Sequence, residues 1–299
     1  MGQASRSPSH GACSYPAPVA TSGCTKETVT AGAYTDAVAA RLYDVAFSWP
    51  RVREADFAEA CLQSFGRRTE GTVLDLACGG GHFLLEMQQR GWRVAGVDIS
   101  PQMLGLAHAR LAKAPVLEAE CMSCFQLTGP FDLVTCWSDS LTYLLSNDEI
   151  IRHLRAVAGV LSDKGVYLVD VGFGRWSDSM WCQPPEAWTP DFSHGWSVPS
   201  GETEVYHDGC DGPPCNGLSH LYTEYLHFRI TDRASGLIRE HTYTAWKRAL
   251  HPQEFAALVS ASAVFEVAAW FTGDMDLSQT LESADGRGRG LALLRKRPG

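Results

Sequence analysis

The chain has 299 residues, of which 45% are hydrophobic, and this length supports one sizeable core or one core with an added subdomain. Its net charge is −9 and it contains no long run of Lys or Arg, which disfavours nucleic acid as a substrate because such partners usually require a basic face. No stretch approaches the roughly 18 consecutive apolar residues of a membrane span, and the N-terminus lacks the apolar run of a secretory signal. We therefore expect a cytoplasmic protein that acts on small molecules and has no membrane partner.

The N-terminal segment, residues 1–30, is predicted to be a disordered tail. It is rich in Ser, Pro, Ala and Gly, and so little apolar surface cannot offset the entropy of ordering it. Residues 34–65 then carry apolar positions at helical spacing, and Trp49-Pro50 divides them into two helices.

Strands and helices alternate in the next part of the chain. Short apolar runs predict strands at 72–76, 93–97, 116–119, 131–136 and 165–171. Helical patterns lie between them at 82–90, 100–113 and 147–161. This alternation implies right-handed crossovers and a parallel sheet that is covered by helices on both faces.

The pattern changes after residue 172. Residues 173–218 show no clear helical period, and the alternating runs 221–230 and 237–245 predict an antiparallel hairpin. A helix at 251–261 and strands at 264–271 and 290–296 follow. We therefore expect an α/β fold with a Rossmann-like, seven-stranded, mostly parallel sheet and an antiparallel substrate subdomain inserted after the fifth strand. The expected units are the binding domain with its N-terminal lid helices, the insertion, and the segment that completes the sheet (31–172, 173–248 and 249–299).

A glycine-rich turn follows the first of these strands. In an open parallel sheet, ligands bind outside the carboxyl ends of the strands. Gly79-Gly80-Gly81 lets a ligand approach the backbone and supplies N–H donors at the start of a helix. Asp98 ends the next strand, where a carboxylate can accept hydrogen bonds from a ribose diol.

A nicotinamide dehydrogenase has the same strand, loop and helix, but two residues argue against it. The third glycine of a dinucleotide loop would fall at Leu84. Asp75 precedes the loop, where a carboxylate would repel a pyrophosphate and attract the cationic amino group of a methionine moiety. Both features favour S-adenosylmethionine (SAM) as the ligand.

Three segments carry a family resemblance. Asp75-Leu76-Ala77-Cys78-Gly79-Gly80-Gly81 resembles the first motif of class I SAM-dependent methyltransferases, with Ala77 at the first glycine position. Residues 96–104 resemble the second motif, and residues 131–144 look like the fourth-strand motif of the subgroup that includes the glycine/sarcosine and amino-sugar N-methyltransferases. The resemblance covers about residues 34–172 and 240–297. It implies transfer of a methyl group from SAM, by in-line displacement, to an N or O nucleophile of a small molecule. A catalytically inactive SAM-binding regulatory or scaffold protein is the alternative.

The resemblance also implies which residues contact SAM. The expected contacts are the methionine end at Asp75, Ala77, Gly79 and Gly81, the ribose at Asp98, the adenine at Ile99 and Met103, and a flanking position at Trp137. Cys121-Met122 occupies the place where the family usually has Asp-Met. Since a thiol is a poor acceptor, either Glu120 shifts in or the backbone near Cys121 serves the adenine alone.

Tyr34 and Tyr43 resemble the tyrosines of the family's lid, with packing on a helix face as the alternative. We expect Tyr43 to be one catalytic residue and His241 the other, because His241 matches a recurring His of the family. A hydroxyl acceptor needs a general base, most often His, whereas an amine needs only deprotonation. An ordinary exposed strand histidine is the alternative for His241. A homodimer is one open assembly state.

The chain contains ten cysteines. A long chain without an export signal favours free thiols. Cys121 and Cys124 with Cys210 and Cys215 would suit a tetrahedral zinc site, and a disulfide between Cys210 and Cys215 is a further alternative. We expect free thiols and no metal.

Overall fold

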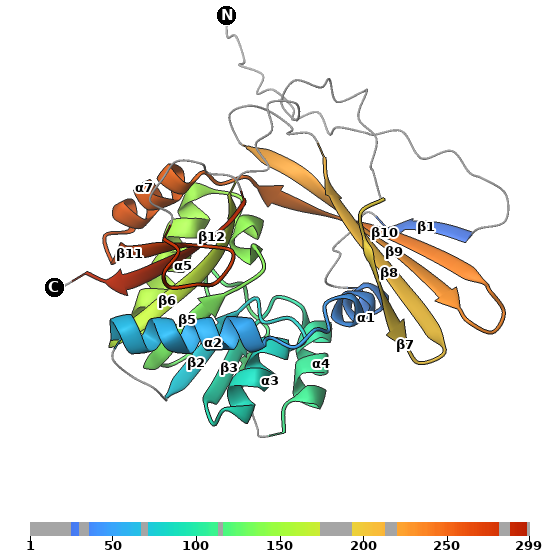
Figure 1. The fold of residues 1–299 in the computed structure, drawn as a ribbon. Helices are drawn as coiled ribbons and strands as arrows, with labels where there is room; N and C mark the ends of the chain where they lie inside the picture. Colours follow the sequence, from blue (N-terminus) through green and yellow to red (C-terminus); the bar gives the residue numbers. More distant parts are fainter. Residues whose placement is uncertain are drawn as a thin grey trace, which may run out of the picture.

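A computed structural model describes residues 25–29, 36–66, 71–112, 116–173, 193–212, 220–280 and 288–297. It contains two β-sheets that lie side by side, with helix α1 (Ala37–Ala46) against the smaller one (Figure 1). Among the described residues, no helix is both long enough and apolar enough to cross a membrane.

The larger sheet has seven strands in the order β11-β12-β6-β5-β2-β3-β4. Strands β2 to β6 pair in parallel, and β12 runs antiparallel to both β6 and β11. This confirms the predicted Rossmann-like, mostly parallel sheet. The strands are β2 (Thr72–Leu76), β3 (Arg93–Val97), β4 (Val116–Glu118), β5 (Phe131–Cys136), β6 (Leu161–Phe173), β11 (Phe265–Thr272) and β12 (Gly288–Lys296).

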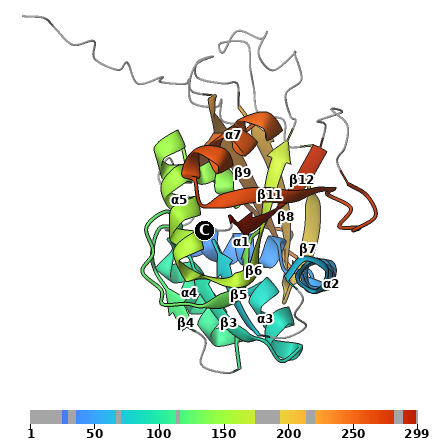
Figure 2. The ribbon, with the colours of Figure 1, turned by 90° about the vertical axis from the view of Figure 1, so that its left-hand side faces the viewer.

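Helices cover both faces of this sheet, as the alternating pattern predicted (Figure 2). One apolar core lies under α5 (Asn147–Val160) and α7 (Pro252–Ser262). The other lies under α2 (Val52–Cys61), α3 (His82–Gln89) and α4 (Pro101–Arg110). Because β2 and β5 are buried between the two cores, their sequences are nearly continuous apolar runs.

The smaller sheet has the order β1-β10-β9-β8-β7. Its strands are β1 (Thr25–Val29), β7 (Trp196–Ser200), β8 (Thr203–Asp211), β9 (Leu221–Asp232) and β10 (Ile238–Arg248). The predicted hairpin is β9–β10, and β7 and β8 extend it through a segment for which the sequence pattern predicted no strand. The structure also corrects the disordered tail at residues 25–29, because β1 pairs in parallel with β10. Backbone pairing with an open sheet edge does not depend on side-chain composition.

Helix α1 connects the two sheets. Asp36 caps its first turn by accepting hydrogen bonds from the N–H groups of Val38 and Ala39, each at 2.9 Å. The buried face of α1 packs on the smaller sheet in a third apolar cluster made of Ala39, Leu42, Ala46, Val205, Leu226, Phe228 and Tyr243. Trp196 also donates a hydrogen bond from Nε1 to the carbonyl of Ala46 at 2.8 Å. These contacts hold the helix across the carboxyl ends of β2 and β3.

Candidate active site

The turn after β2 has a left-handed backbone at three positions. Gly79 and Gly81 have φ of 54° and 77°, and Ala77 has φ of 55° although it carries a Cβ. A left-handed conformation is unfavourable for L-residues other than glycine, which fits the resemblance that places Ala77 at the first glycine position of the motif. The turn therefore bends sharply and leaves the N–H of Gly79 directed at the next strand.

Asp98 follows β3 and organises this turn. Its Oδ2 accepts a hydrogen bond from the N–H of Gly79 and its Oδ1 accepts one from the N–H of Ser100, both at 2.8 Å. The residue is buried, with an exposed fraction of 8%. Burial raises the pKa of Asp98, and the two backbone N–H groups oppose that rise. A carboxylate with two oxygens in this position retains acceptor capacity for a diol.

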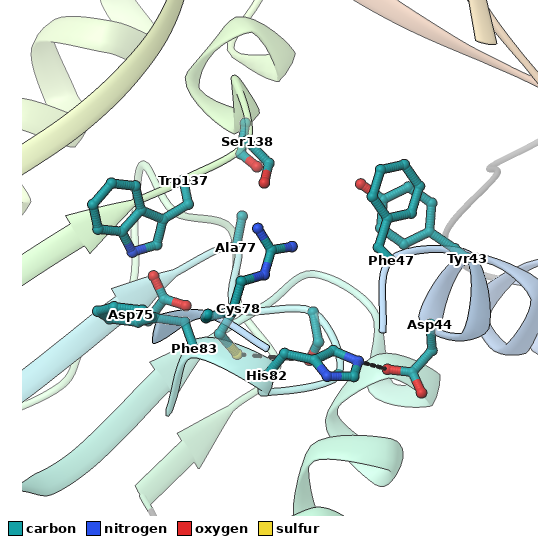
Figure 3. Close-up of a pocket in the computed structure, with 14 residues that line it drawn as sticks. Tyr43, Asp44, Phe47, Asp75, Ala77, Cys78, His82, Phe83, Trp137 and Ser138 are labelled. Atoms are coloured by element: carbon teal, nitrogen blue, oxygen red, sulfur yellow. Dashed lines mark hydrogen bonds and ion pairs between the residues drawn. The ribbon is translucent and has the colours of Figure 1, made fainter. Parts of the chain in front are cut away.

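Asp75 lies near the end of β2 and is also buried. It accepts a hydrogen bond from Thr135 Oγ1 at 2.7 Å. Burial raises the pKa of Asp75 to about 7, while the Thr135 hydrogen bond and the Arg51 charge oppose the rise. The indole of Trp137 lies beside this carboxylate (Figure 3). Trp137 Nε1 is buried and has no hydrogen-bond partner among the residues that the structure describes.

Two adjoining cavities open at these carboxylates and share Tyr43, Ala77, Gly79 and Ser140 in their walls. The narrow one, of about 70 Å³, is lined by Asp75, Trp137 and other residues of the turn. The larger one, of about 450 Å³, has a volume typical of small-molecule sites. Its walls are Val97, Asp98, Ile99, Met103, Glu120, Cys121, Met122, Tyr143, Leu144, Thr244, Ala245 and Trp246.

The structure thus gathers most of the residues predicted to bind the cofactor around one pair of cavities: Asp75, Ala77, Gly79, Asp98, Ile99, Met103, Cys121, Met122 and Trp137. Tyr43, predicted to be catalytic, lines both cavities. Gly81 is in neither wall. A Cβ added to Gly81 would lie 3.0 Å from the Cβ of Ala107, so this glycine lets α3 and α4 approach each other. Tyr34 lies outside the described residues.

His241 does not lie at the site, contrary to the prediction from the sequence. It lines neither cavity, and its ring stacks on Tyr243 with centroids 6.3 Å apart. The β9–β10 register sets His241 opposite Phe228, whereas Ala245, four residues later, is a β10 residue that reaches the cavity. Four residues of strand span about 13 Å. The alternation of side chains predicts which residues of the strand share a face, but it does not predict which part of the strand lies over the cavities.

The larger cavity contains both hydrogen-bond acceptors that the sequence analysis proposed for adenine, namely the Glu120 carboxylate and the backbone near Cys121. Glu120, Cys121 and Met122 all line the larger cavity. Glu120 Oε2 accepts a hydrogen bond from the N–H of Gln126 at 2.8 Å, and Cys121 Sγ lies 3.2 Å from Ser123 Oγ. The Glu120 carboxylate is therefore present at the cavity and is already oriented by the backbone.

The cysteines show no metal site in the part of the chain that is described. Cys121 and Cys124 are free thiols. The described residues contain no group of three or more His, Cys, Asp or Glu that would hold a metal ion. Cys215, a member of the zinc hypothesis, lies outside them.

Arg51 is a site residue that the sequence analysis missed. It lines the narrow cavity, is buried, and pairs with Glu54 at 2.8 Å. Its guanidinium also lies 4.8 Å from the ring centre of Trp49. The only signal in the sequence is its place directly after the Trp49-Pro50 break, because its place in the same cavity as Asp75 depends on tertiary packing.

A second missed feature ties α1 to the glycine turn. Asp44 Oδ1 lies 3.0 Å from His82 Nε2 (Figure 3). Asp44 Oδ2 accepts a hydrogen bond from Arg110 Nη2 at 2.7 Å. Arg110 also donates to the carbonyl of Gly80. This latch, defined as Asp44, His82 and Arg110, holds Tyr43 over both cavities. Burial raises the pKa of Tyr43 to about 12, so its phenol is neutral at physiological pH.

Comparison with known proteins agrees with this geometry. Residues 73–165 match the family described as "Methyltransferase domain". YqeM of Bacillus subtilis (strain 168) is 31% identical over 149 residues, which cover 46% of this chain and 59% of YqeM. A dTDP-4-amino-2,3,4,6-tetradeoxy-D-glucose N,N-dimethyltransferase of Saccharopolyspora spinosa is 30% identical over 99 residues, which cover 33% of this chain and 39% of that enzyme. The chain thus spans about half the length of the curated relatives it matches.

Solved structures share the fold over most of the chain. A SAM-dependent methyltransferase from Clostridium acetobutylicum ATCC 824 aligns with a TM-score of 0.65 at 19% identity, covering 86% of this chain and 96% of that one. The sugar N-methyltransferase KedS8 from Streptoalloteichus sp. ATCC 53650 aligns with a TM-score of 0.64 at 21% identity, covering 95% and 100%. Residues 73–165 therefore match the methyltransferase domain family, and the chain shares the Rossmann-like fold of solved SAM-dependent methyltransferases.

Proposed function

We propose that this protein is a SAM-dependent methyltransferase that moves a methyl group to an N or O nucleophile of a small molecule. The observation that carries the proposal is the pair of buried carboxylates, Asp75 and Asp98, at the carboxyl ends of neighbouring parallel strands. Both line connected cavities at the edge of the sheet where such folds bind their ligands.

The side chains of the narrow cavity fit the amino-acid end of SAM. Asp75 offers an anion for the ammonium group, and Arg51 offers a guanidinium for the carboxylate. Trp137 Nε1 adds a buried donor with no partner among the described residues. This set suits a zwitterion, whereas a pyrophosphate would meet the charge of Asp75.

The larger cavity fits the nucleoside end. Asp98 would accept from the ribose diol, and Ile99, Met103 and Met122 provide apolar surface for adenine. When bound, SAM supplies a methyl group on a cationic sulfur that a nucleophile takes by in-line displacement. The protein contributes the position of both reactants and the exclusion of water by the α1 lid.

The acceptor is proposed to enter beside strand β10. Thr244, Ala245 and Trp246 form the wall opposite the nucleoside residues. The relatives named as amino-sugar dimethyltransferases support a small-molecule acceptor for this chain as well. The net charge of −9 supports the absence of a nucleic-acid partner. A homodimer, a cytoplasmic location and the absence of a membrane partner stay predictions from the sequence.

Titration calorimetry with S-adenosylhomocysteine, followed by transfer of isotopically labelled methyl groups to panels of amines and phenols, tests the proposal. We expect the wild type to bind S-adenosylhomocysteine and Asp75→Asn to bind it more weakly. Asp132→Asn is a matched control, because Asp132 is a buried aspartate on β5 that accepts from the N–H of Thr72 at 3.0 Å and lines neither cavity. Absence of binding to folded protein would contradict the proposal. Binding without transfer to any acceptor would favour the alternative of an inactive SAM-binding protein.

A further inference from the structure

A buried cluster of charges lies between β9, β10 and the short helix η2 (Ser140–Tyr143). Lys247 Nζ is 3.1 Å from Asp139 Oδ2 and 3.3 Å from Glu224 Oε1. Tyr143 donates a hydrogen bond from its hydroxyl to Glu224 Oε2 at 2.6 Å. That distance is within the range of a hydroxyl bound to an ionised carboxylate. The cluster therefore joins the smaller sheet to the loop that follows β5.

The cluster contains more negative than positive charge. Burial lowers the pKa of Lys247, but the Glu224 and Asp139 carboxylates outweigh that effect and hold its pKa well above the usual range. The Lys247 ammonium thus contacts two carboxylates of the described residues, and its side chain is 8% exposed, whereas those of Asp139 and Glu224 are 23% and 15% exposed. Carboxylates that are partly shielded from water attract a nearby cation, so a ligand that brings a positive charge is favoured there.

Tyr143 connects this cluster to the proposed site. It lines the larger cavity together with Tyr43, Asp98 and Ser140, whereas Glu224 lies behind it and lines neither cavity. The Lys247 ammonium lies 5.1 Å from the Tyr143 ring centre and packs against the ring face. A ligand in the cavity would therefore lie against Tyr143, whose hydroxyl is held by its donation to Glu224.

The loop that presents the cluster has a costly backbone. Ser138 and Asp139 are consecutive non-glycine residues with φ of 58°. A left-handed backbone is unfavourable for L-residues other than glycine and is retained where the surrounding structure requires it, often at functional sites. Here the loop brings the Asp139 carboxylate to Lys247.

We propose that the Tyr143–Glu224 pair binds a cationic amine acceptor and takes its proton. The inference rests on the proposed function and narrows its acceptor to an amine. An N–H bond of the ammonium breaks and its electron pair stays on nitrogen. The proton moves to the Tyr143 oxygen as the phenol proton moves to Glu224 Oε2. The nitrogen lone pair is then available for the methyl group, and Glu224 later returns its proton to solvent. Tyr143 is the catalytic residue, and Glu224 is a positioning and proton-storing residue that acts through it.

Charged and titratable groups surround Glu224 on every packed element. They are Lys247 on β10, Asp139 and Tyr143 at η2, Tyr222 on its own strand, Asp211 opposite it on β8, and Tyr43 on α1. Burial raises the pKa values of Tyr43 and Tyr222 above their usual range, so neither loses its proton near neutral pH. Lys247 is held as a cation by its two carboxylates. Glu224 is therefore the carboxylate that directly faces the Tyr143 hydroxyl.

A binding experiment tests the charge preference without turnover. In sinefungin a carbon replaces the sulfur of SAM and carries an amino group in the place of the methyl group, whereas S-adenosylhomocysteine has a neutral sulfur and no group there. The ratio of their dissociation constants is measured by calorimetry in the wild type, in Glu224→Gln and in Glu240→Gln. We expect Glu224→Gln to reduce the preference for sinefungin about tenfold or more, because a buried carboxylate charge is lost. Glu240→Gln removes the same charge from β10, where Glu240 pairs with Arg229 at 3.2 Å, and should change nothing.

The outcomes separate the two proposals. If neither ligand binds, the proposed function fails and this inference fails with it. If both bind and the ratio is the same in Glu224→Gln as in the wild type, the inference fails while the proposed function stands. If Glu224→Gln does not fold, the same ratio of dissociation constants is measured in Tyr143→Phe, because this variant keeps the Glu224–Lys247 pair and removes only the hydroxyl. A ratio equal to that of the wild type would then contradict the inference.

A rate experiment distinguishes a relay from a structural ion pair. A panel of amines that includes glycine and sarcosine is first screened with labelled SAM to find an acceptor that the wild type methylates. With that acceptor, kcat should be about 100-fold lower in Glu224→Gln than in the wild type. The acidic limb of the pH profile of kcat/KM should also move to higher pH, because an amide cannot store the proton. Tyr143→Phe should lower kcat about as much as the double variant Tyr143→Phe/Glu224→Gln, because the two groups act as one unit. An unmoved pH limb, or a panel in which only phenols are methylated, would overturn the inference.

Discussion

Asp98→Asn should weaken the binding of ribose-containing ligands while it leaves the chain folded. In the structure each carboxylate oxygen already accepts one backbone hydrogen bond at 2.8 Å, from Gly79 and from Ser100. Hydrogen bonds to a charged group contribute about 1.5–3 kcal/mol each. Two of them to a diol would sum to about 3–6 kcal/mol, and the amide oxygen retains part of this. With about 1.4 kcal/mol for each factor of ten, the lower bound of about 3 kcal/mol corresponds to a loss of roughly 100-fold.

The same substitution has a structural cost that must be measured separately. The amide nitrogen of Asn would face a backbone N–H, donor against donor, on one side of the turn. Leaving such a buried donor unsatisfied costs about 1–3 kcal/mol of stability. Ser100→Ala is the control for a loss of stability alone, because Ser100 Oγ caps α4 by accepting from the N–H of Met103 at 3.2 Å. That change should cost about 1 kcal/mol in urea unfolding and leave binding unaltered.

The assay compares two ligands that differ in the ribose. We expect calorimetry to show that Asp98→Asn weakens 5′-methylthioadenosine strongly and adenine little. Wild-type affinity of folded Asp98→Asn for 5′-methylthioadenosine would refute the assignment. An equal loss for both ligands would mean that the substitution acts by collapsing the turn.

Three further substitutions test the rest of the site. The pKa of Asp75 is raised by burial to about 7, so S-adenosylhomocysteine affinity should rise with pH up to about 7, by at most tenfold per unit, and Asp75→Asn should remove this dependence in calorimetry. Because the folded protein keeps this proton where the unfolded chain has lost it, the contribution of Asp75 to stability should fall as pH rises from about 4 through 7 in urea unfolding. Asp44→Asn breaks the latch to His82 and Arg110, so stopped-flow should show faster ligand release by several-fold. Ala77→Gly relieves a left-handed residue and should stabilise the chain by about 0.5–1 kcal/mol, after allowance for the greater freedom of glycine when unfolded.

Each of these has a matched comparison. Asp56→Asn breaks an ion pair with Arg90 at a side chain that is 65% exposed, and such pairs contribute little, so ligand release should not change. Ala107→Gly is the same alanine-to-glycine substitution as Ala77→Gly but lies inside helix α4. It should destabilise the folded chain by about 1 kcal/mol. Equal destabilisation by the two glycine substitutions would contradict the strain at Ala77. A pH-independent affinity in the wild type would contradict the buried, protonated Asp75.

The donor half of the site could be predicted because its residues are local in sequence. A buried apolar run, a glycine turn and a carboxylate at the end of the next strand are contiguous patterns, and parallel strands bring their carboxyl ends to one edge. Asp75, Gly79 and Asp98 were identified in this way and lie together in the structure. The order of strands and helices followed from the same periodicities.

The acceptor half was decided by tertiary structure. Tyr143 and Glu224 are 81 residues apart in sequence, and only the packing of the smaller sheet on η2 brings their side chains to 2.6 Å. The sequence predicted which residues of β10 share a face, but strand periodicity does not say where along a strand another element packs. The prediction therefore fell on His241, and Lys247 was missed. Arg51 lines the same cavity as Asp75 although it lies 24 residues before it in the sequence, and β1 pairs with β10, which is more than 200 residues away in the sequence. The sequence by itself thus determined the layered fold and the residues of the proposed methyl-donor site, whereas contacts between distant segments decided the surroundings of the proposed acceptor site.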